Sequence, residues 1–167
     1  MDRRTQQFLT IVDANKGIVY KVAYAYCNYT IDREDLIQEI LIQLWLSLDK
    51  YDTRFKLSTW IYRVALNTSI SFFRKNKTRK EKTFALTPAL EIKLSETEKD
   101  SGESEVSRLE QMIQELSDID KAIFLLYIDG ITYKEISEII GITSTNVSTK
   151  ISRIKKSIKL KIKKSNT

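Results

Sequence analysis

Several residue types are scarce or absent in this chain. Its 167 residues include no histidine, one cysteine, one proline and four glycines. Without histidine, the chain can form neither a cysteine–histidine zinc site nor a histidine-based catalytic triad. The one cysteine, Cys27, cannot form a disulfide within the chain, which favours a reduced protein in which Cys27 packs as a small apolar residue. The sequence indicates no metal site and no other cofactor.

Glycine and proline are the residues that most often end helices, so their scarcity bears on the fold class. Apolar residues recur mostly at steps of three and four, which is the helical period. No apolar run reaches the length of a membrane span, and the first residues, MDRRTQQ, lack the pattern of a signal peptide. We expect an all-α, cytoplasmic protein without membrane insertion.

The chain has a formal net charge of +6 and a pI near 9.3, and its 42% of hydrophobic residues suffices for a folded core. Residues 132–164 carry its clearest motif. Thr132 and Glu135 have the spacing of a capping box at a helix start. Gly141 can take the left-handed conformation that ends a helix, and Thr143 can cap the next one. Two capped helices joined by a short turn with glycine predict a helix-turn-helix.

The second helix of this pair has an apolar stripe and a basic face. The stripe recurs at steps of four and three: Val147, Ile151, Ile154, Ile158 and Ile162. No acidic residue occurs from Lys150 onward. An ordinary helical hairpin with a solvated basic face is one interpretation. A face of a single sign favours the other, in which the helix neutralises phosphates and enters a major groove of DNA.

The N-terminal half predicts four helices, at residues 3–14, 18–27, 32–51 and 58–77. We expect Phe8, Leu9 and Val12 to point inward, and Gly17 to mark a break or a tight helix contact between the first two helices. A polar loop at residues 51–57 precedes the fourth helix.

The fourth helix presents two distinct faces. Its core face is expected at Ile61, Ala65, Thr68 and Phe72, which fall together at 100° per residue. A second face gathers one aromatic ring, an amide and two guanidinium groups: Trp60, Arg63, Asn67, Ser71 and Arg74. Aromatic rings stack on bases, amides read base edges and arginines hold phosphates. In the alternative, Trp60 belongs to the core and the arginines are simply solvated.

A change of composition divides the chain. After a basic run, residues 83–105 contain the only proline and become acidic, and apolar periodicity fades. Periodicity returns with a helix near residues 105–116 and another at 118–129, which Ser117 or Asp118 caps and Gly130 ends. We predict an N-terminal helical domain at 1–78, a flexible linker at 79–104 and a C-terminal helix-turn-helix domain at 105–167.

Three segments read together resemble one family. They are DLIQE at 35–39, TWIYRVALN at 59–67 and YKEISEIIGI at 133–142, in this order and at these distances. The chain is similar, outside its linker, to sigma factors of bacterial RNA polymerase, in the small two-domain extracytoplasmic-function group. The resemblance implies a subunit that gives the polymerase its promoter specificity and that has no catalytic site.

The resemblance also implies three binding surfaces. The polymerase surface comprises residues that resemble those docking on the coiled-coil clamp of the largest subunit: Asp35, Gln38, Glu39 and Trp45. The −10 surface resembles the part that captures the melted promoter strand: Arg54, Lys56, Trp60, Arg63, Asn67 and Arg74. The −35 surface resembles the reader of duplex DNA: Ser148, Thr149, Lys150, Ser152, Arg153 and Lys156. The family often has a basic residue at the position of Ser148, which leaves the preferred −35 sequence open.

Other functions remain as alternatives. Asp35 and Glu39, four residues apart, are also compatible with a metal site or with plain solvation, although the chain lacks histidine and a denser acidic cluster. A free-standing helix-turn-helix regulator needs only the C-terminal half. A nucleic-acid enzyme needs a carboxylate cluster or a nucleophile–base pair, and none stands out. The expected partners are core RNA polymerase and promoter DNA. An anti-sigma factor often masks members of this family, and the sequence leaves open whether this chain has one.

Overall fold

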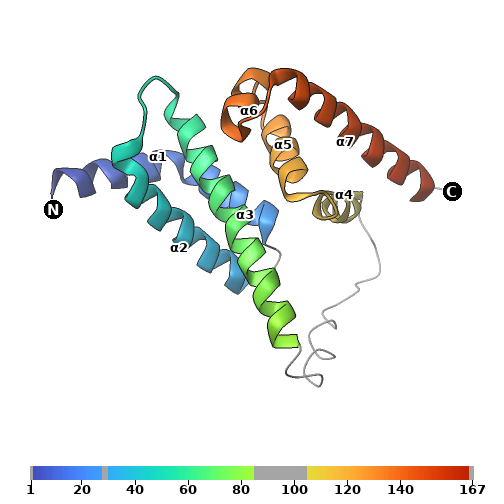
Figure 1. Ribbon diagram of the computed structural model, residues 1–167, viewed down its shortest axis with the longest axis horizontal. Helices are drawn as coiled ribbons and strands as arrows, with labels where there is room; N and C mark the ends of the chain where they lie inside the picture. Colours follow the sequence, from blue (N-terminus) through green and yellow to red (C-terminus); the bar gives the residue numbers. More distant parts are fainter. Residues whose placement is uncertain (1, 28–29, 85–104, 166–167) are drawn as a thin grey trace.

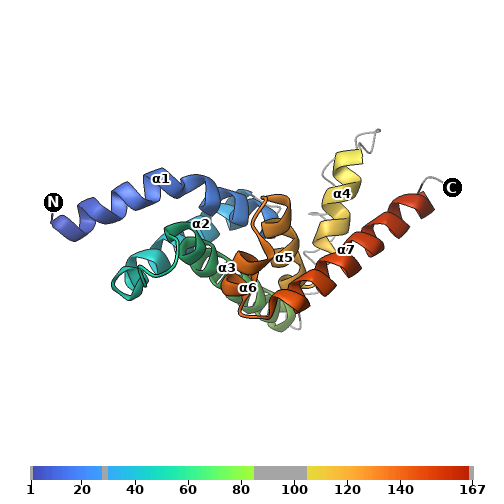
Figure 2. The same cartoon turned by 90° about the horizontal axis from the view of Figure 1, so that it is seen from above.

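The computed structural model describes residues 2–27, 30–84 and 105–165. These residues form helices joined by turns, and no strand occurs among them. The chain makes two groups of helices that lie side by side, with the N- and C-termini at opposite ends of the molecule (Figures 1 and 2). The all-α prediction is confirmed. No helix of the described ranges is both long and apolar enough to span a bilayer.

The N-terminal domain is a bundle of α1 (Arg3–Tyr26), α2 (Thr30–Ser47) and α3 (Leu57–Phe84), with a short 3₁₀ turn, η1 (Leu48–Lys50), after α2. Leucine, isoleucine and alanine side chains at helical spacing on α2 and α3 fill its interior: Leu36, Ile40, Leu44, Ile61, Ala65 and Leu66. Val22, Ala23 and Tyr26 complete this core from α1.

The predicted break at Gly17 is wrong, because α1 runs as one helix through it. A methyl group on Gly17 would meet nothing within 4 Å, so no close helix contact requires the glycine either. A glycine costs about 1 kcal/mol in a helix, a cost that burial of Val19 and Val22 on the same helix exceeds. Leu9, expected to point inward, is exposed, whereas Phe8 packs against the core.

The C-terminal domain contains α4 (Glu105–Gln114), α5 (Asp118–Ile128), α6 (Tyr133–Ile140) and α7 (Ser144–Ser165). The predicted caps are confirmed. Thr132 and Glu135 form the capping box of α6, and Gly141 ends that helix at φ 82°. The backbone N–H of Asn146 donates to Thr143 Oγ1 at 3.2 Å at the start of α7. The helix-turn-helix therefore forms where local rules place it.

The apolar stripe of α7 is buried from Val147 to Ile158. Val147 and Ile151 belong to the main core cluster, whereas Ile154 and Ile158 pack with Phe124 of α5 and with the end of α4. Ile162, the last predicted member of the stripe, is exposed. The final turns of α7 project past α5, so they have less of the domain to pack against (Figure 2).

The two domains touch through α3 with α6 and through α1 with α5. One cluster of buried apolar residues runs from the N-terminal bundle into α5, α6 and the start of α7. α3 continues to Phe84, so residues 79–84 of the predicted linker are helical. The rest of that linker, residues 85–104, lies outside the described residues.

Candidate nucleic-acid and polymerase interface

The −35 surface lies on the first half of α7, opposite the buried stripe. Ser148, Ser152, Arg153 and Lys156 are exposed. Thr149 is exposed as well, and its hydroxyl donates to the Thr145 carbonyl at 3.0 Å. This surface therefore presents hydroxyl and cationic groups without competing carboxylates on its own helix.

Lys150 differs from the other members of the −35 surface, because its side chain forms an ion pair within the protein. Its ammonium group donates to Asp120 Oδ1 on α5 at 2.8 Å. The sequence did not predict this pair, since the two residues lie thirty positions apart. A contact between Lys150 and DNA stays a prediction, and it requires the lysine to exchange Asp120 for a phosphate.

Acidic residues on α5 and α6 of the C-terminal domain meet cations of the N-terminal domain. Glu135 Oε1 accepts from Lys56 Nζ at 2.5 Å. This contact raises the pKa of Lys56, and it helps to hold the pKa of Glu135 below its ordinary value. Asp118 Oδ2 lies 3.9 Å from Arg74 Nε. Two members of the −10 surface, Lys56 and Arg74, are thus paired with carboxylates of the C-terminal domain.

A third member of the −10 surface, Arg63, also contacts α6. Its Nη2 donates to the Glu138 carbonyl at 2.6 Å, and its guanidinium carbon lies 5.4 Å from the centre of the Phe55 ring. Arg54, in contrast, is held within its own loop by Asp52, with Nη2 2.6 Å from Oδ2. That hydrogen bond is the main cause that lowers the pKa of Asp52 to about 2.

Trp60 is 8% exposed and belongs to the core, the alternative that the sequence left open. Its ring packs against Tyr51, with centroids 5.3 Å apart. In this arrangement it offers no free ring face to a base. A DNA contact at Trp60 stays a prediction, and it requires the ring to be uncovered.

Asn67 is exposed and lines a shallow hollow between α2 and α3. Glu39 and Gln43 of α2 line the same hollow, and Gln43 Nε2 donates to Glu39 Oε1 at 2.9 Å. The structure thus brings a predicted polymerase residue, Glu39, beside a predicted DNA residue, Asn67. Gln43 was missed, although its position four residues after Glu39 places it on the same helix face.

Exposed apolar residues that the sequence analysis did not name lie next to the predicted polymerase residues on α2. Asp35 and Gln38 are exposed, and Ile42 and Leu46 continue the same helix face with 50% and 60% of their surface exposed. Trp45 is half-buried against α1, edge-on to Phe8 at 5.2 Å, and less available to a partner. The wide apolar face of α2 was the sequence feature that could have identified Ile42 and Leu46.

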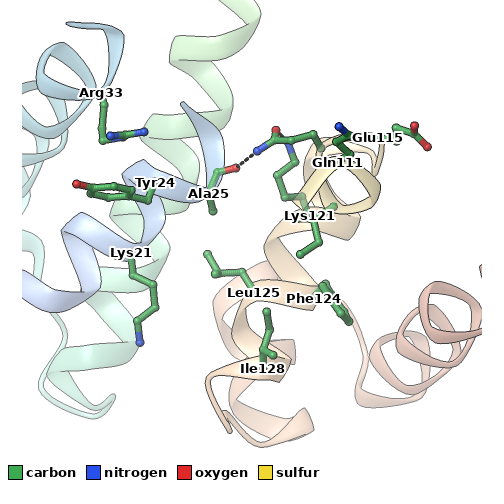
Figure 3. Close-up of a pocket in the computed structure, with 12 residues that line it drawn as sticks. Lys21, Tyr24, Ala25, Arg33, Gln111, Glu115, Lys121, Phe124, Leu125 and Ile128 are labelled. Carbon is green, nitrogen blue, oxygen red and sulfur yellow. Dashed lines mark hydrogen bonds between the residues drawn. The ribbon is translucent and has the colours of Figure 1, made fainter. Parts of the chain in front are cut away.

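A groove runs between the domains, with α1 on one side and α4 and α5 on the other (Figure 3). Gln114 crosses it by donating from Nε2 to the Ala25 carbonyl at 3.2 Å. Lys121 is 4% exposed at its edge, with Nζ 2.8 Å from Gln114 Oε1, and burial lowers its pKa. No sequence prediction fell on this groove. Among the described residues, no three acidic or cysteine side chains lie close enough to hold a metal.

The fold and these surfaces define a two-domain, helix-turn-helix DNA-binding protein. Two family models match it: Sigma-70 region 2 at residues 11–79 and Sigma-70 region 4 at residues 107–158. The chain is 30% identical to the ECF RNA polymerase sigma factor SigW of Bacillus subtilis, over 93% of this chain and 89% of that protein. It is 27% identical to the ECF RNA polymerase sigma-E factor of Escherichia coli K12, over 86% and 81% of the two chains.

Solved structures show the same fold. The sigma factor RpoE of Bartonella quintana, solved with the anti-sigma factor NepR, aligns with TM-score 0.66 at 17% identity over 95% of this chain and 96% of that one. CnrH, solved with the cytosolic domain of CnrY, aligns with TM-score 0.68 at 15% identity over 95% and 89%. The chain belongs to the sigma-70 family of RNA polymerase sigma factors, in its ECF group. The resemblance inferred from the sequence is confirmed, and the protein acts in promoter recognition for RNA polymerase.

Proposed function

We propose that the three surfaces divide promoter recognition between the two domains. The exposed face of α7 reads the duplex −35 element, α3 and its preceding loop capture the melted −10 strand, and α2 docks on core polymerase. The observation that carries this proposal is α7 itself. Its reading face is exposed and free of carboxylates, and the helix is held by a capped helix-turn-helix.

Within the −35 surface, Arg153 is the residue best suited to read a base. Its exposed guanidinium can bind guanine through two hydrogen bonds, or else hold a phosphate. Serine hydroxyls such as those of Ser148 and Ser152 bond to either kind of base edge and discriminate poorly. We therefore assign most of the base discrimination of this helix to Arg153.

Within the −10 surface, the hollow at Asn67 is the part open to solvent in this arrangement. The Asn67 amide, the Glu39 carboxylate and the Gln43 amide supply both donors and acceptors, which is the chemistry needed to read a base edge. A base drawn out of the stack costs a few kcal/mol, which such contacts can offset. The hollow is our candidate for that base.

On α2, the exposed Asp35 and Gln38 beside Ile42 and Leu46 form a polar-rimmed apolar patch suited to a protein partner. We assign this patch to core polymerase. An anti-sigma factor is a second proposed partner, because the aligned RpoE structure contains one. The proposed role is one of binding in the cytoplasm, without catalysis.

Reconstitution with core polymerase tests the proposal. Run-off transcription on genomic fragments, followed by start-site mapping, should give starts that depend on this protein and share −35 and −10 elements. Arg153→Ala should lower transcription from such a promoter roughly tenfold to a hundredfold, the worth of one specific base contact. Arg3→Ala, which removes an exposed arginine from α1, is the matched control and should change little. Starts that do not depend on the protein would contradict the proposal.

Polymerase docking needs a separate measurement. Asp35→Ala combined with Glu39→Ala should weaken capture of core polymerase while the melting temperature of the free protein stays unchanged. Equal capture by the double variant would remove these residues from the polymerase surface.

A further inference from the structure

The second half of α7 extends beyond the −35 surface. The match to Sigma-70 region 4 ends at residue 158, whereas α7 continues to Ser165, and its last turns project past α5 (Figure 2). This extension carries a cluster of lysines, in a part of the chain that has no acidic residue from Lys150 onward: Lys159, Lys161, Lys163 and Lys164. None of these four lysines belongs to the three predicted surfaces.

Two lysines in this half of α7 face the protein. Lys155 Nζ lies 4.2 Å from the centre of the Tyr127 ring on α5, and Lys161 donates to the Glu115 carboxylate, one residue after the end of α4. Ile158, which lies between them in the sequence, is buried. These contacts fix the rotation of α7 about its axis to within about one turn of its end, so the opposite face of the helix has a defined direction.

The lysines on that opposite face continue the −35 surface in a row along the helix. Ser152, Lys156, Lys159 and Lys163 are spaced by four, three and four residues, so they fall within about 60° of one another around the helix axis. All four are exposed. The face that presents Ser148 and Ser152 therefore continues as a row of ammonium groups.

The length of this row decides what it can meet on DNA. From Ser148 to Lys163 the helix rises by about 22 Å, whereas a major groove is only about 12 Å wide. Lys156 lies about 12 Å from Ser148 along the axis, and Lys159 and Lys163 lie beyond it. A straight helix whose first turns lie in the groove therefore carries these last two lysines to the groove edge, which is lined by phosphates.

Stabilisation of the helix end explains only part of this pattern. Lysines in the last turn of a helix interact favourably with the negative end of the helix dipole, which accounts for Lys163 and Lys164. Lys159 lies before the last turn, where that effect has faded. A merely solvated face does not explain why every charge of the row has the same sign. Contact with phosphates explains both the sign and the position of Lys159.

We propose that Lys159 and Lys163 bind the phosphate backbone of duplex DNA immediately outside the −35 element, so that α7 holds a longer stretch of promoter than its reading face covers. This inference rests on the proposed function of α7 as the reader of the −35 element. Because the two contacts reach only phosphates, they carry no sequence information, and the affinity that they add depends on salt.

The test compares two double variants of the full-length chain that remove equal charge from the same helix. Lys159→Gln with Lys163→Gln changes the outward row, and Lys155→Gln with Lys161→Gln, the matched control, changes the lysines that face the protein. Fluorescence anisotropy measures binding to a long fluorescein-labelled duplex of arbitrary sequence between about 50 and 200 mM salt. Circular dichroism checks that the helix content of each variant is unchanged.

Each phosphate contact contributes about 0.9 to the slope of log affinity against log salt concentration. The outward variant should therefore lose about 1.8 from this slope, and about tenfold to a hundredfold in affinity near 0.1 M salt. The inward variant should keep the slope of the wild type. Equal losses by the two variants would reduce the effect to net charge and overturn the proposal. An outward variant that binds as the wild type does would overturn it as well.

Hydroxyl-radical footprinting of the reconstituted holoenzyme, on a promoter mapped by run-off transcription, locates the contact. The wild type and the inward variant should protect sugars next to the −35 element that the outward variant leaves unprotected. The same footprint for the wild type and the outward variant would contradict the proposal. If no promoter depends on the protein, the proposed function fails instead, and the salt series on the duplex of arbitrary sequence still decides whether Lys159 and Lys163 bind phosphates.

Discussion

Lys121 is a buried cation whose removal should stabilise the protein. It lies on α5 with 4% of its surface exposed, and its ammonium donates to one amide oxygen, Gln114 Oε1, at 2.8 Å. The rings of Tyr26 and Phe73 lie 5.3 and 5.9 Å from its nitrogen. Burial lowers its pKa, and the charge of Asp118 opposes that shift only in part. The charged form is therefore less stable in the folded protein than in water.

The magnitude follows from the interactions exchanged in Lys121→Met. The charged hydrogen bond contributes about 1.5–3 kcal/mol and the two ring contacts about 0.5–2 kcal/mol. Removing an ammonium from water costs several kcal/mol after relaxation. Methionine keeps the length of the side chain and gains about 0.3–1.5 kcal/mol from sulfur–ring contacts. We expect the variant to be more stable by about 1 kcal/mol at neutral pH, a rise in melting temperature of about 2–4 °C.

The pH dependence tests independently whether Lys121→Met stabilises the protein. Because the folded-state pKa of Lys121 is lowered, the unfolded chain binds more protons than the folded one between that pKa and the ordinary value of 10.5. The free energy of unfolding of the wild type should therefore rise relative to that of the methionine variant as pH rises through this window. Urea unfolding at neutral pH and near pH 10 measures the gap, with Lys161→Met, a more exposed lysine, as the control. A less stable variant, or a gap that stays constant with pH, would refute the reasoning.

Two further predictions concern the helix cap and the patch on α2. Thr132→Ala should lower the free energy of unfolding by about 1 kcal/mol through loss of the capping box, whereas Thr10→Ala, outside any cap, should cost less; urea titrations compare them. Ile42→Ser with Leu46→Ser should weaken core polymerase binding roughly thirtyfold, because both side chains would lose an apolar contact surface. The exposed Leu9→Ser is the control, and equal loss in a pull-down would remove α2 from the interface.

Local sequence rules predicted the helix-turn-helix well, because the residues that cap its helices lie within a few positions of one another. Thr132 and Glu135 are three residues apart, and Gly141 follows the last apolar residue, so the caps could be placed without knowing the rest of the fold. The same local rule failed at Gly17. There the packing of neighbouring residues in α1 outweighs the weak helix propensity of glycine.

The partners of the predicted site residues could not be predicted in this way. Lys56 and Glu135 are 79 positions apart, and Lys150 and Asp120 are 30 apart. Periodicity predicts which face of its helix each cation occupies, but it does not predict which residue of another helix that face contacts. For the same reason the sequence left Trp60 open between core and DNA, and only the packing against Tyr51 resolved it in this arrangement.

The segregation of charge in the C-terminal domain separates the two DNA surfaces and leads to one more prediction. Lys21 of α1 and Tyr62 of α3 both donate to the Asp129 carboxylate at the end of α5, and so join the two domains. If this domain contact covers only the −10 surface, weakening it should leave duplex binding unchanged, because Arg153 and Ser152 are exposed. Lys21→Gln with Tyr62→Phe should therefore bind a short −35 duplex as the wild type does, within about twofold, while its affinity for the single strand rises. Fluorescence anisotropy on both probes at one salt concentration provides the comparison, since phosphate contacts make every such affinity depend on salt. A parallel gain on the duplex would mean that the variants increase general affinity for nucleic acid, and the selective role of the domain contact would be lost.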